Sequence, residues 1–488
     1  MSVIQINNLS FAYEGSYDYI FEDVSFQLDT DWKTGLIGRN GRGKTTLMHL
    51  MRGKYKYSGS ILSNVLFEYF PCKIEDASVD TLAVVEQVCP EYELWQLLRE
   101  LNRLEVDEGV LYRAFHTLSN GEQTKVLLAT LFIKENHFLL IDEPTNHLDI
   151  EARRVLRKYL NSKTGFILAS HDRLFLDACV DHILAINRMD IQVQKGTFTS
   201  WYDNKQRQNE YERTQNKKLK REIEHLSDAA ARTAQWSDKI EKSKYGSGPV
   251  DRGYVGHQAA KMMKRSKAIQ SRRQEMAEEK SKLLKNIELT DSLKLSPLKY
   301  HKDKLISFED VSVYYGERCV CEHLQFDICR NDRIALNGKN GSGKSSILKL
   351  ICEEDLSYKG AFHKGSQLKI SYVAQHPSDL SGNLTDYARS YGIEESLFKA
   401  ILRKLDFPRI QFEKDMCAFS DGQKKKVLLA RSLCEQAHLY VWDEPLNYID
   451  VFSRMQIEQL LLAFEPTILF VEHEEAFVLN IATKKIEL

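Results

Sequence analysis

The chain has 488 residues, of which 43% are hydrophobic and 28% are charged, and its formal net charge is −1. This is the composition of a soluble globular protein, and no run of about 18 or more apolar residues is present to cross a membrane. The N-terminal residues lack the basic and apolar parts of a secretory signal, and the nine cysteines show no CxxC spacing. We therefore expect a cytoplasmic protein with reduced thiols.

Residues 1–201 show the pattern of an α/β domain. Clusters or alternations of apolar and β-branched residues predict strands over Val3–Phe11, Val24–Leu28, Thr34–Ile37, His137–Ile141 and Gly165–Ala169. The last two are short apolar runs that suit buried strands in a sheet with parallel elements. Helix formers over Lys44–Met51, stopped by Gly53, predict a helix directly after a Gly-rich loop. Residues 301–488 repeat this order and predict a second domain.

Residues 202–300 have a different amino-acid composition from the two α/β segments. Their first part is rich in Glu, Lys, Gln, Arg and Ala and predicts a long helix to Lys244, and helical composition returns over 257–288. Glycines between these stretches predict an antiparallel hairpin with a loop at its tip. Residues 202–296 hold about 22 basic and about 14 acidic residues, a net charge of about +8. This basic segment between two acidic domains suggests a nucleic-acid partner, although a solvated spacer remains the alternative.

The chain carries one set of nucleotide-binding motifs twice, about 300 residues apart. Two Gly-rich loops of the form GxxGxGK[TS] lie between a predicted strand and a predicted helix, where backbone N–H groups, a lysine and a hydroxyl hold phosphates and Mg²⁺. The predicted ATP-binding residues of these loops are Gly38, Asn40, Gly41, Gly43, Lys44, Thr45 and Thr46, and Gly338, Asn340, Gly341, Gly343, Lys344, Ser345 and Ser346.

An Asp-Glu-Pro sequence follows a predicted strand in each half. Asp142 and Asp443 are placed to hold Mg²⁺ together with Thr45 and Ser345. The next residue, Glu143 or Glu444, is placed to polarise an attacking water. A single carboxylate at a strand end is often only a helix cap, but the repetition in both halves favours the catalytic interpretation.

Leu118-Ser119-Asn120-Gly121-Glu122 and Phe419-Ser420-Asp421-Gly422-Gln423 resemble the signature motif of ATP-binding cassette (ABC) proteins. This resemblance implies an α/β fold with two nucleotide-binding domains that enclose two ATP molecules, each bound by the loop of one domain and the signature of the other. It further implies that Ser119, Gly121, Ser420 and Gly422 contact phosphate and that Tyr13 and Tyr315 stack on adenine. His171 and His473 would be the catalytic switch histidines, Asp149 and Asp450 would form the D-loops, and Gln375 would serve ATP and Mg²⁺ as the Q-loop glutamine.

Two positions depart from the family pattern. Asn120 and Asp421 replace a glycine of the signature, and because Asn and Asp adopt left-handed backbone more readily than most residues, we expect the turn to survive. Cys72 occupies the first Q-loop position, so we expect the two sites to turn over unequally. Both glutamates are present, and we expect both sites to hydrolyse ATP.

The stretch Asp142-Glu143-Pro144-Thr145-Asn146-His147-Leu148-Asp149 is similar to that of ABC-F proteins, twin-cassette ATPases with a long helical linker. This resemblance covers essentially the whole chain. It implies binding to the E site of the 70S ribosome, with the linker tip directed at P-site tRNA and 23S rRNA. A monomer suffices for this role, with no membrane or DNA partner. With no large arm in the first domain, the chain looks like the Lsa/Vga branch, which protects ribosomes from lincosamides, streptogramin A and pleuromutilins.

The candidate tip residues are Lys244, Tyr245, Gly253, Tyr254, Val255 and His257. The two tyrosines could stack on RNA bases, or they could only pack the hairpin turn. Three other functions stay open: a housekeeping ABC-F translation factor, the ATPase subunit of an ABC transporter with a separate membrane partner, and a DNA-repair ATPase. DNA-repair ATPases usually carry a coiled coil inside a cassette, whereas this linker joins two complete ones.

Overall fold

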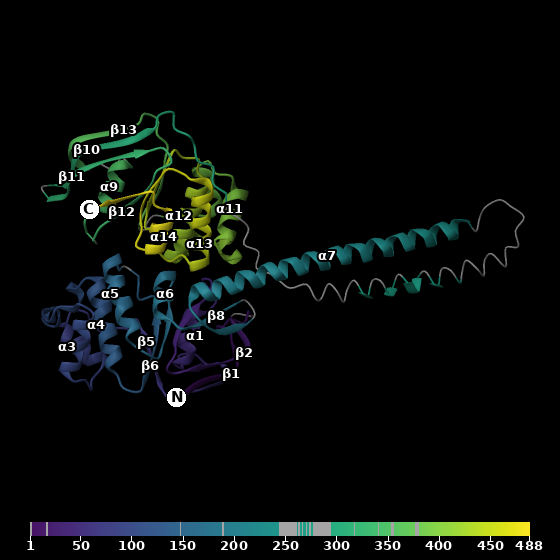
Figure 1. Cartoon of the computed structure of the whole chain (residues 1–488), viewed down its shortest axis with the longest axis horizontal. Coiled ribbons are helices and arrows are strands. Elements are labelled where there is room, and N and C mark those ends of the chain that lie inside the picture. The colour runs from purple at the N-terminus through teal and green to yellow at the C-terminus, as the bar shows by residue number, and fades with distance from the viewer. Residues whose placement is uncertain are drawn as a thin grey trace, which may run out of the picture. The chain divides into compact units, whose positions relative to one another are not determined.

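The computed structural model describes residues 2–15, 18–146, 148–187, 190–243, 294–316, 318–339, 341–352, 356–375 and 380–488, with residue 261 and runs of two or three residues between 264 and 276. The chain forms two compact units (Figure 1). One unit comprises Met1–Thr199 and Asp291–Leu488, which we call the first half and the second half. The other unit is the linker, Ser200–Thr290.

The first half contains two sheets and a helical layer. Its strands are β1 (Val3–Phe11), β2 (Phe21–Asp29), β3 (Lys33–Ile37), β4 (Ser58–Leu62), β5 (Leu66–Phe70), β6 (His137–Asp142), β7 (Phe166–Ala169), β8 (His182–Ile186) and β9 (Ile191–Lys195). Its helices are α1 (Lys44–Met51), α2 (Thr81–Val88), α3 (Leu94–Arg103), α4 (Asn120–Ile133), α5 (Ile150–Asn161) and α6 (Arg173–Cys179), with 3-10 turns η1 (Glu108–Tyr112) and η2 (Phe115–Thr117).

The second half repeats this order. Its strands are β10 (Lys304–Tyr315), β11 (Arg318–Cys329), β12 (Arg333–Asn337), β13 (Ser357–Lys364), β14 (Ile370–Val373), β15 (Leu439–Asp443), β16 (Ile468–Val471) and β17 (Lys484–Glu487). Its helices are α9 (Lys344–Ile351), α10 (Leu384–Ser390), α11 (Glu395–Lys404), α12 (Asp421–Cys434), α13 (Val451–Phe464) and α14 (Glu475–Ile481), with 3-10 turns η3 (Arg409–Glu413) and η4 (Met416–Ala418).

Each half has one core sheet whose central strands are parallel. The strand order is β5-β6-β7-β3-β8-β9 in the first half, where only β8 and β9 pair antiparallel, and β14-β15-β16-β12-β17 in the second. A three-stranded antiparallel sheet, β2-β1-β4 or β11-β10-β13, completes each half. The carboxyl ends of parallel strands meet at one sheet edge, which is where ligands bind in such sheets.

The central strands are buried on both faces. Every residue of β7 and of β16 is buried, which explains their continuous apolar sequences. In the first half the buried apolar side chains of β3, β6 and β7 pack with those of α1 and of the antiparallel sheet. This packing fixes α1 against the strand ends, and with it the Gly-rich loop. The sequence prediction of an α/β fold that occurs twice along the chain is confirmed.

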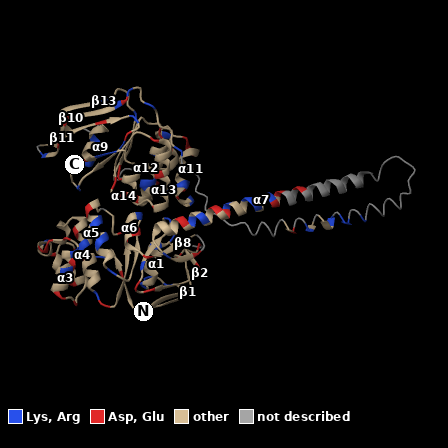
Figure 2. Ribbon diagram, viewed as in Figure 1, with Lys and Arg blue, Asp and Glu red and all other residues tan. Residues whose placement is uncertain are grey.

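The linker begins with α7 (Phe198–Ser243), where the sequence predicts a long helix. Its described part carries both basic and acidic side chains (Figure 2). The expected loop tip and most of the returning helix lie outside the described residues, so the hairpin itself stays a prediction.

Candidate ATP sites

Both Gly-rich loops are built so that only glycine fits before the helix. Gly43 and Gly343 cap α1 and α9 with φ of 92° in each case. A Cβ on Gly43 would lie 2.6 Å from Ile20 Cγ2, and one on Gly343 would lie 2.1 Å from Cys321 Sγ. The loop therefore stays tight and turns its backbone N–H groups toward the space ahead of an eight-residue helix, a suitable place for phosphate.

The two loop lysines fold back over their own loops. Lys44 Nζ donates to Gly38 O at 2.7 Å, and Lys344 Nζ donates to Gly338 O and Lys339 O at 2.8 Å each. Burial lowers the pKa of both lysines, and nearby carboxylates oppose that shift. Each ammonium group is thereby held where the β- and γ-phosphates of a nucleotide would lie.

Residues of opposite halves meet at each loop. Among the carboxylates that raise the pKa of Lys44 is Asp450 of the second half, and Asp149 of the first half acts in the same way on Lys344. Asn40 Nδ2 also donates to Tyr448 O at 2.8 Å. Each phosphate loop thus faces the D-loop of the other half, as the resemblance to ABC proteins implies.

The predicted Mg²⁺ ligands lie together in each half. Thr45 Oγ1 donates to Asp142 Oδ2 at 2.7 Å, and Ser345 hydrogen-bonds Asp443. Asp443 Oδ1 is buried and accepts no hydrogen bond within the described part of the chain. Burial also raises the pKa of Asp443. An unsatisfied carboxylate oxygen beside a hydroxyl fits a hard cation that takes oxygen ligands, so these residues fit Mg²⁺.

Each predicted catalytic glutamate lies beside its switch histidine. His171 Nε2 is 3.3 Å from Glu143 Oε1, and His473 Nε2 is 3.4 Å from Glu444 Oε1. Both glutamates have positive φ, 49° and 46°. The backbone N–H of each donates to the adjacent strand, at Ala169 O or Val471 O. This turn directs each carboxylate out of the strand end.

The environments of the two glutamates differ. Glu444 accepts from Gln375 Nε2 at 2.8 Å and Asn447 Nδ2 at 2.5 Å. Burial alone would raise the pKa of Glu444, but His473 and these two amides lower it to about 2. Burial and Asp142 instead raise the pKa of Glu143 to about 7. No amide side chain of the described residues donates to Glu143, and Cys72 occupies the position that Gln375 has in the second half.

Tyr69 is a site residue that sequence reasoning missed. Its hydroxyl donates to Asp142 Oδ2 at 3.0 Å, the same oxygen that Thr45 contacts. Burial and the Asp142 charge raise the pKa of Tyr69. Its position could have indicated this role, because Tyr69 lies three residues before Cys72 in β5, and β5 pairs with β6, the strand that ends at Asp142.

The signature serines cap helices. Ser119 and Ser420 precede α4 and α12, and each forms a capping box with the residue three positions on, Glu122 or Gln423. Gly121 and Gly422 lie in the first turns. We expect the turn to survive at Asn120 and Asp421 because these residues tolerate left-handed backbone, but that tolerance is not used: both residues begin right-handed helices, and neither has a positive φ. A helical first turn needs no glycine there, so the substitution is tolerated.

The two predicted adenine-stacking tyrosines are partly exposed. Tyr13 is 43% exposed and Tyr315 is 46% exposed, so each ring has a free surface for a base. The Tyr13 hydroxyl hydrogen-bonds Thr46 Oγ1 at 2.9 Å, which places this ring near α1. Thr46 and Ser346 are themselves buried. Asn340 and all six tip candidates lie outside the described residues.

Comparison with known proteins agrees with this geometry. A family model described as "ABC transporter" matches residues 21–146 and 321–447. The chain is 26% identical over 495 residues to "Ribosome protection protein VmlR" of Bacillus subtilis (strain 168), covering 99% of this chain and 86% of that protein. It is 25% identical to "ATP-binding protein Uup" of Buchnera aphidicola subsp. Acyrthosiphon pisum, covering 99% of this chain and 80% of that protein.

Solved structures share the fold. The archaeal ribosome recycling factor aABCE1, in complex with the ribosomal stalk protein aP1, matches with a TM-score of 0.63 and 17% identity. The match covers 98% of this chain and 87% of that chain. At this identity the likeness concerns the fold alone, a tandem arrangement of two nucleotide-binding domains.

Proposed function

The chain belongs to the ATP-binding cassette family, is an ATPase and resembles the ABC-F proteins, and on that premise we propose that it acts on the ribosome. Specifically, it protects the peptidyl transferase centre from antibiotics. The observation that carries this proposal is the full-length similarity to a ribosome protection protein, which includes both cassettes and the linker between them.

The ATP chemistry follows from the residues of each site. Lys44 and Lys344 bind the β- and γ-phosphates, and Tyr13 and Tyr315 bind adenine. Thr45 with Asp142, and Ser345 with Asp443 and Gln375, would hold Mg²⁺, which neutralises phosphate oxygens when bound. Glu143 and Glu444 orient and polarise the attacking water, and His171 and His473 orient those carboxylates.

ATP would link the two halves because each bound nucleotide would contact residues of both halves. The loop of one half faces the D-loop of the other, so a bound nucleotide adds contacts that exist only when the halves are closed. Ser119 and Ser420 each stand at a helix N-terminus, where a γ-phosphate is favoured. Closure with ATP and release after hydrolysis would gate binding to the ribosome.

The linker supplies the proposed contact with RNA. Its net charge of about +8 suits a phosphate-rich partner, because Lys and Arg release counterions when they bind phosphates. In the proposed mechanism the protein binds the E site in the cytoplasm as a monomer. The tip then displaces P-site tRNA or reshapes the drug pocket, which protects against lincosamides, streptogramin A and pleuromutilins.

Two alternatives remain. A housekeeping ABC-F translation factor would have the same cassettes and linker, and its loss or trapping would affect growth rather than drug tolerance. An ABC transporter subunit would need a membrane partner. Among the described helices, none is long and apolar enough to cross a membrane.

The test is drug susceptibility of a sensitive Gram-positive host that expresses the wild type or the Glu143→Gln/Glu444→Gln variant. The panel contains a lincosamide, a streptogramin A, a pleuromutilin and an unrelated cell-wall drug. We expect protection against the first three by the wild type alone. Growth arrest by the variant with no protection by the wild type would instead support the housekeeping alternative.

A further inference from the structure

Ion pairs join the two halves at residues that closely follow His171 and His473 in the sequence. Arg173, two residues after His171, pairs with Glu458 on α13, and its Nε lies 3.9 Å from Glu474 Oε1. The Arg173 side chain is only 16% exposed and that of Glu458 only 9%. Glu458 is also held by Asn480 Nδ2 at 2.6 Å. The contact is therefore largely withdrawn from water and has a fixed geometry.

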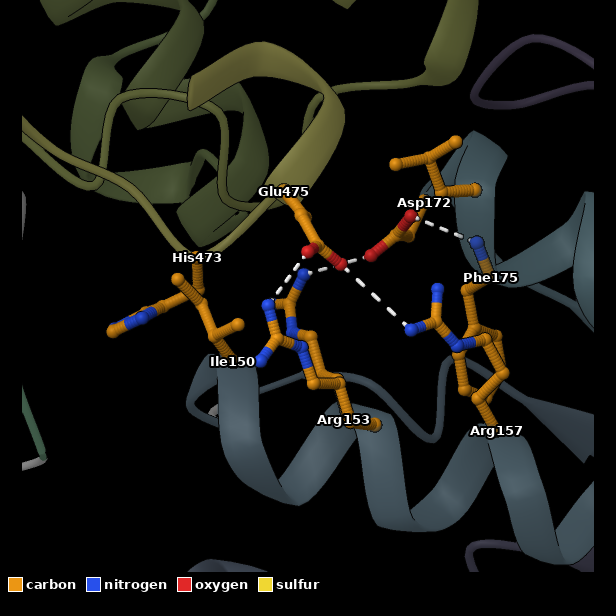
Figure 3. A pocket seen from close by; sticks show the side chains of 9 residues that line it. Ile150, Arg153, Arg157, Asp172, Phe175, His473 and Glu475 are labelled. Atoms are coloured by element: carbon orange, nitrogen blue, oxygen red, sulfur yellow. Dashed lines mark hydrogen bonds and ion pairs between the residues drawn. The ribbon is translucent and has the colours of Figure 1, made fainter. Parts of the chain in front are cut away.

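A second contact joins the halves with the charges reversed. Glu475, two residues after His473, points toward arginines of α5 (Figure 3). Its Oε1 lies 2.7 Å from Arg154 Nη2, and its Oε2 lies 3.8 Å from Arg157 Nη2. We call these six residues the ionic seam: Arg154, Arg157 and Arg173 of the first half, and Glu458, Glu474 and Glu475 of the second.

The two contacts involve equivalent positions of the repeat, with the roles of the two halves exchanged. Arg157 lies as far after Asp149 as Glu458 lies after Asp450, and Arg173 and Glu475 follow their switch histidines at equal distance. The pairs Arg173–Glu458 and Glu475–Arg157 thus use equivalent positions. At both positions the first half has arginine and the second half has glutamate.

The neighbouring pairs do not follow this rule. Arg153 binds Asp172 at 3.2 Å within the first half, and the equivalent Arg454 binds Glu474 at 3.0 Å within the second. Here the charge pattern is the same in both halves. The reversal is therefore confined to the positions that reach across.

We propose that the ionic seam is a recognition surface whose one partner is the opposite half of the same chain. Two first halves brought together in this way would oppose Arg173 and Arg157, and two second halves would oppose Glu475 and Glu458. Like charges at such distances repel, most strongly at the largely buried Arg173–Glu458 position and less at the more exposed Glu475 position. Only the pairing of unlike halves is favourable. This inference requires two cassettes on one chain and does not depend on a role at the ribosome.

The test uses the full chain and measures amide hydrogen exchange. Glu475→Arg places an arginine against Arg154 and Arg157, and Glu458→Arg places one against Arg173. We expect either change to speed exchange in both α6 and α14 by about tenfold, because both helices lie at the seam. Adding Arg154→Glu and Arg157→Glu to Glu475→Arg restores opposite charges and should return exchange close to that of the wild type.

Two controls separate the seam from folding. Lys304→Glu reverses an exposed 2.7 Å ion pair with Asp327 away from the seam and should leave α6 and α14 unchanged. Exchange in β1 and β10 should stay at the wild-type rate in all the seam variants, which would show that each half is folded. The proposal is overturned if α6 and α14 exchange at the wild-type rate in both single variants. It is also overturned if they exchange as fast in the triple variant as in Glu475→Arg.

Discussion

At the scale of single residues, the two glutamates that we propose to be catalytic have unequal hydrogen-bond partners. Glu444 is held by Gln375, Asn447 and His473. Glu143 Oε1 lies 3.3 Å from His171 Nε2 but accepts no hydrogen bond within the described part of the chain. A carboxylate fixed by several hydrogen bonds stays aligned toward an attacking water. The second half's loop therefore forms the better-organised hydrolytic site.

This difference predicts that the two single Glu→Gln variants retain unequal ATPase activity. At saturating Mg-ATP, Glu143→Gln leaves the site of Glu444 active and should retain about threefold more ATPase activity than Glu444→Gln. The added change Gln375→Ala should reduce the activity that remains in Glu143→Gln and leave that of Glu444→Gln unchanged. Equal activity of the two single variants, or the reverse order, would refute the inequality.

Tyr69 supplies a second test at this scale. Its hydroxyl holds the Asp142 oxygen that Thr45 also contacts, and a typical hydrogen bond contributes about 1 kcal/mol. We expect Tyr69→Phe, in a Glu143→Gln/Glu444→Gln background, to weaken Mg-ATP binding at one of the two sites by about fivefold. Calorimetric titration of both sites at several Mg²⁺ concentrations measures this.

The matched control is Tyr372→Phe. Tyr372 occupies the same place in β14 that Tyr69 occupies in β5, three residues before Gln375. If both phenylalanine variants bind Mg-ATP as tightly as their parent, the hydroxyl of Tyr69 does not organise the site.

At the scale of elements, a buried carboxylate connects the helical layer of the first half to its core. Glu100 on α3 accepts from the Tyr159 hydroxyl at 2.8 Å and pairs with Lys163 just after α5 and with Arg103. Burial would raise the pKa of Glu100, but the hydrogen bonds from Lys163 and Tyr159 lower it. Because α3 packs on α4, this link positions the signature helix relative to α5.

We predict that Glu100→Gln lowers the free energy of unfolding by about 3 kcal/mol at pH 7, since it leaves Lys163 without its buried partner. The folded-state pKa of Glu100 lies below its unfolded value. The ionised form therefore stabilises the fold fully above the unfolded pKa of about 4.3, and that stabilisation is lost as pH falls below it through the lower folded-state pKa. Denaturant unfolding at a series of pH values from pH 7 to about pH 2.5 should show the difference steady down to about pH 4.3 and shrinking below it. A difference that stays constant to the lowest pH would contradict the assignment.

Elements with local signals could be predicted from the sequence. The ranges of β1 and α1 match the prediction because alternation, helix formers and Gly53 all act locally. The Gly-rich loops and Asp-Glu-Pro turns could be located because their chemistry needs contiguous residues. The bond from Tyr69 to Asp142 and the ionic seam could not be foreseen, since they join residues far apart in the chain that only the packing of strands and helices brings together.

At the scale of the whole molecule, the account links two ATP sites to a basic linker. Each site is built from both halves, and the ionic seam holds the halves in register beside the switch histidines. The bound nucleotide would then affect the linker, because the linker connects the two halves along the chain. The ribosome is the partner that this arrangement and the full-length relative favour.

The most direct test of this claim is co-sedimentation with 70S ribosomes through a sucrose cushion. The Glu143→Gln/Glu444→Gln variant lacks both glutamates that we propose polarise the attacking water, so we expect it to bind ATP without hydrolysing it. It should then pellet with ribosomes in ATP and stay in the supernatant in ADP. Wild-type protein should pellet weakly in either nucleotide because hydrolysis releases it. Failure of the ATP-bound variant to pellet, or equal pelleting in ATP and ADP, would contradict ATP-gated action on the ribosome.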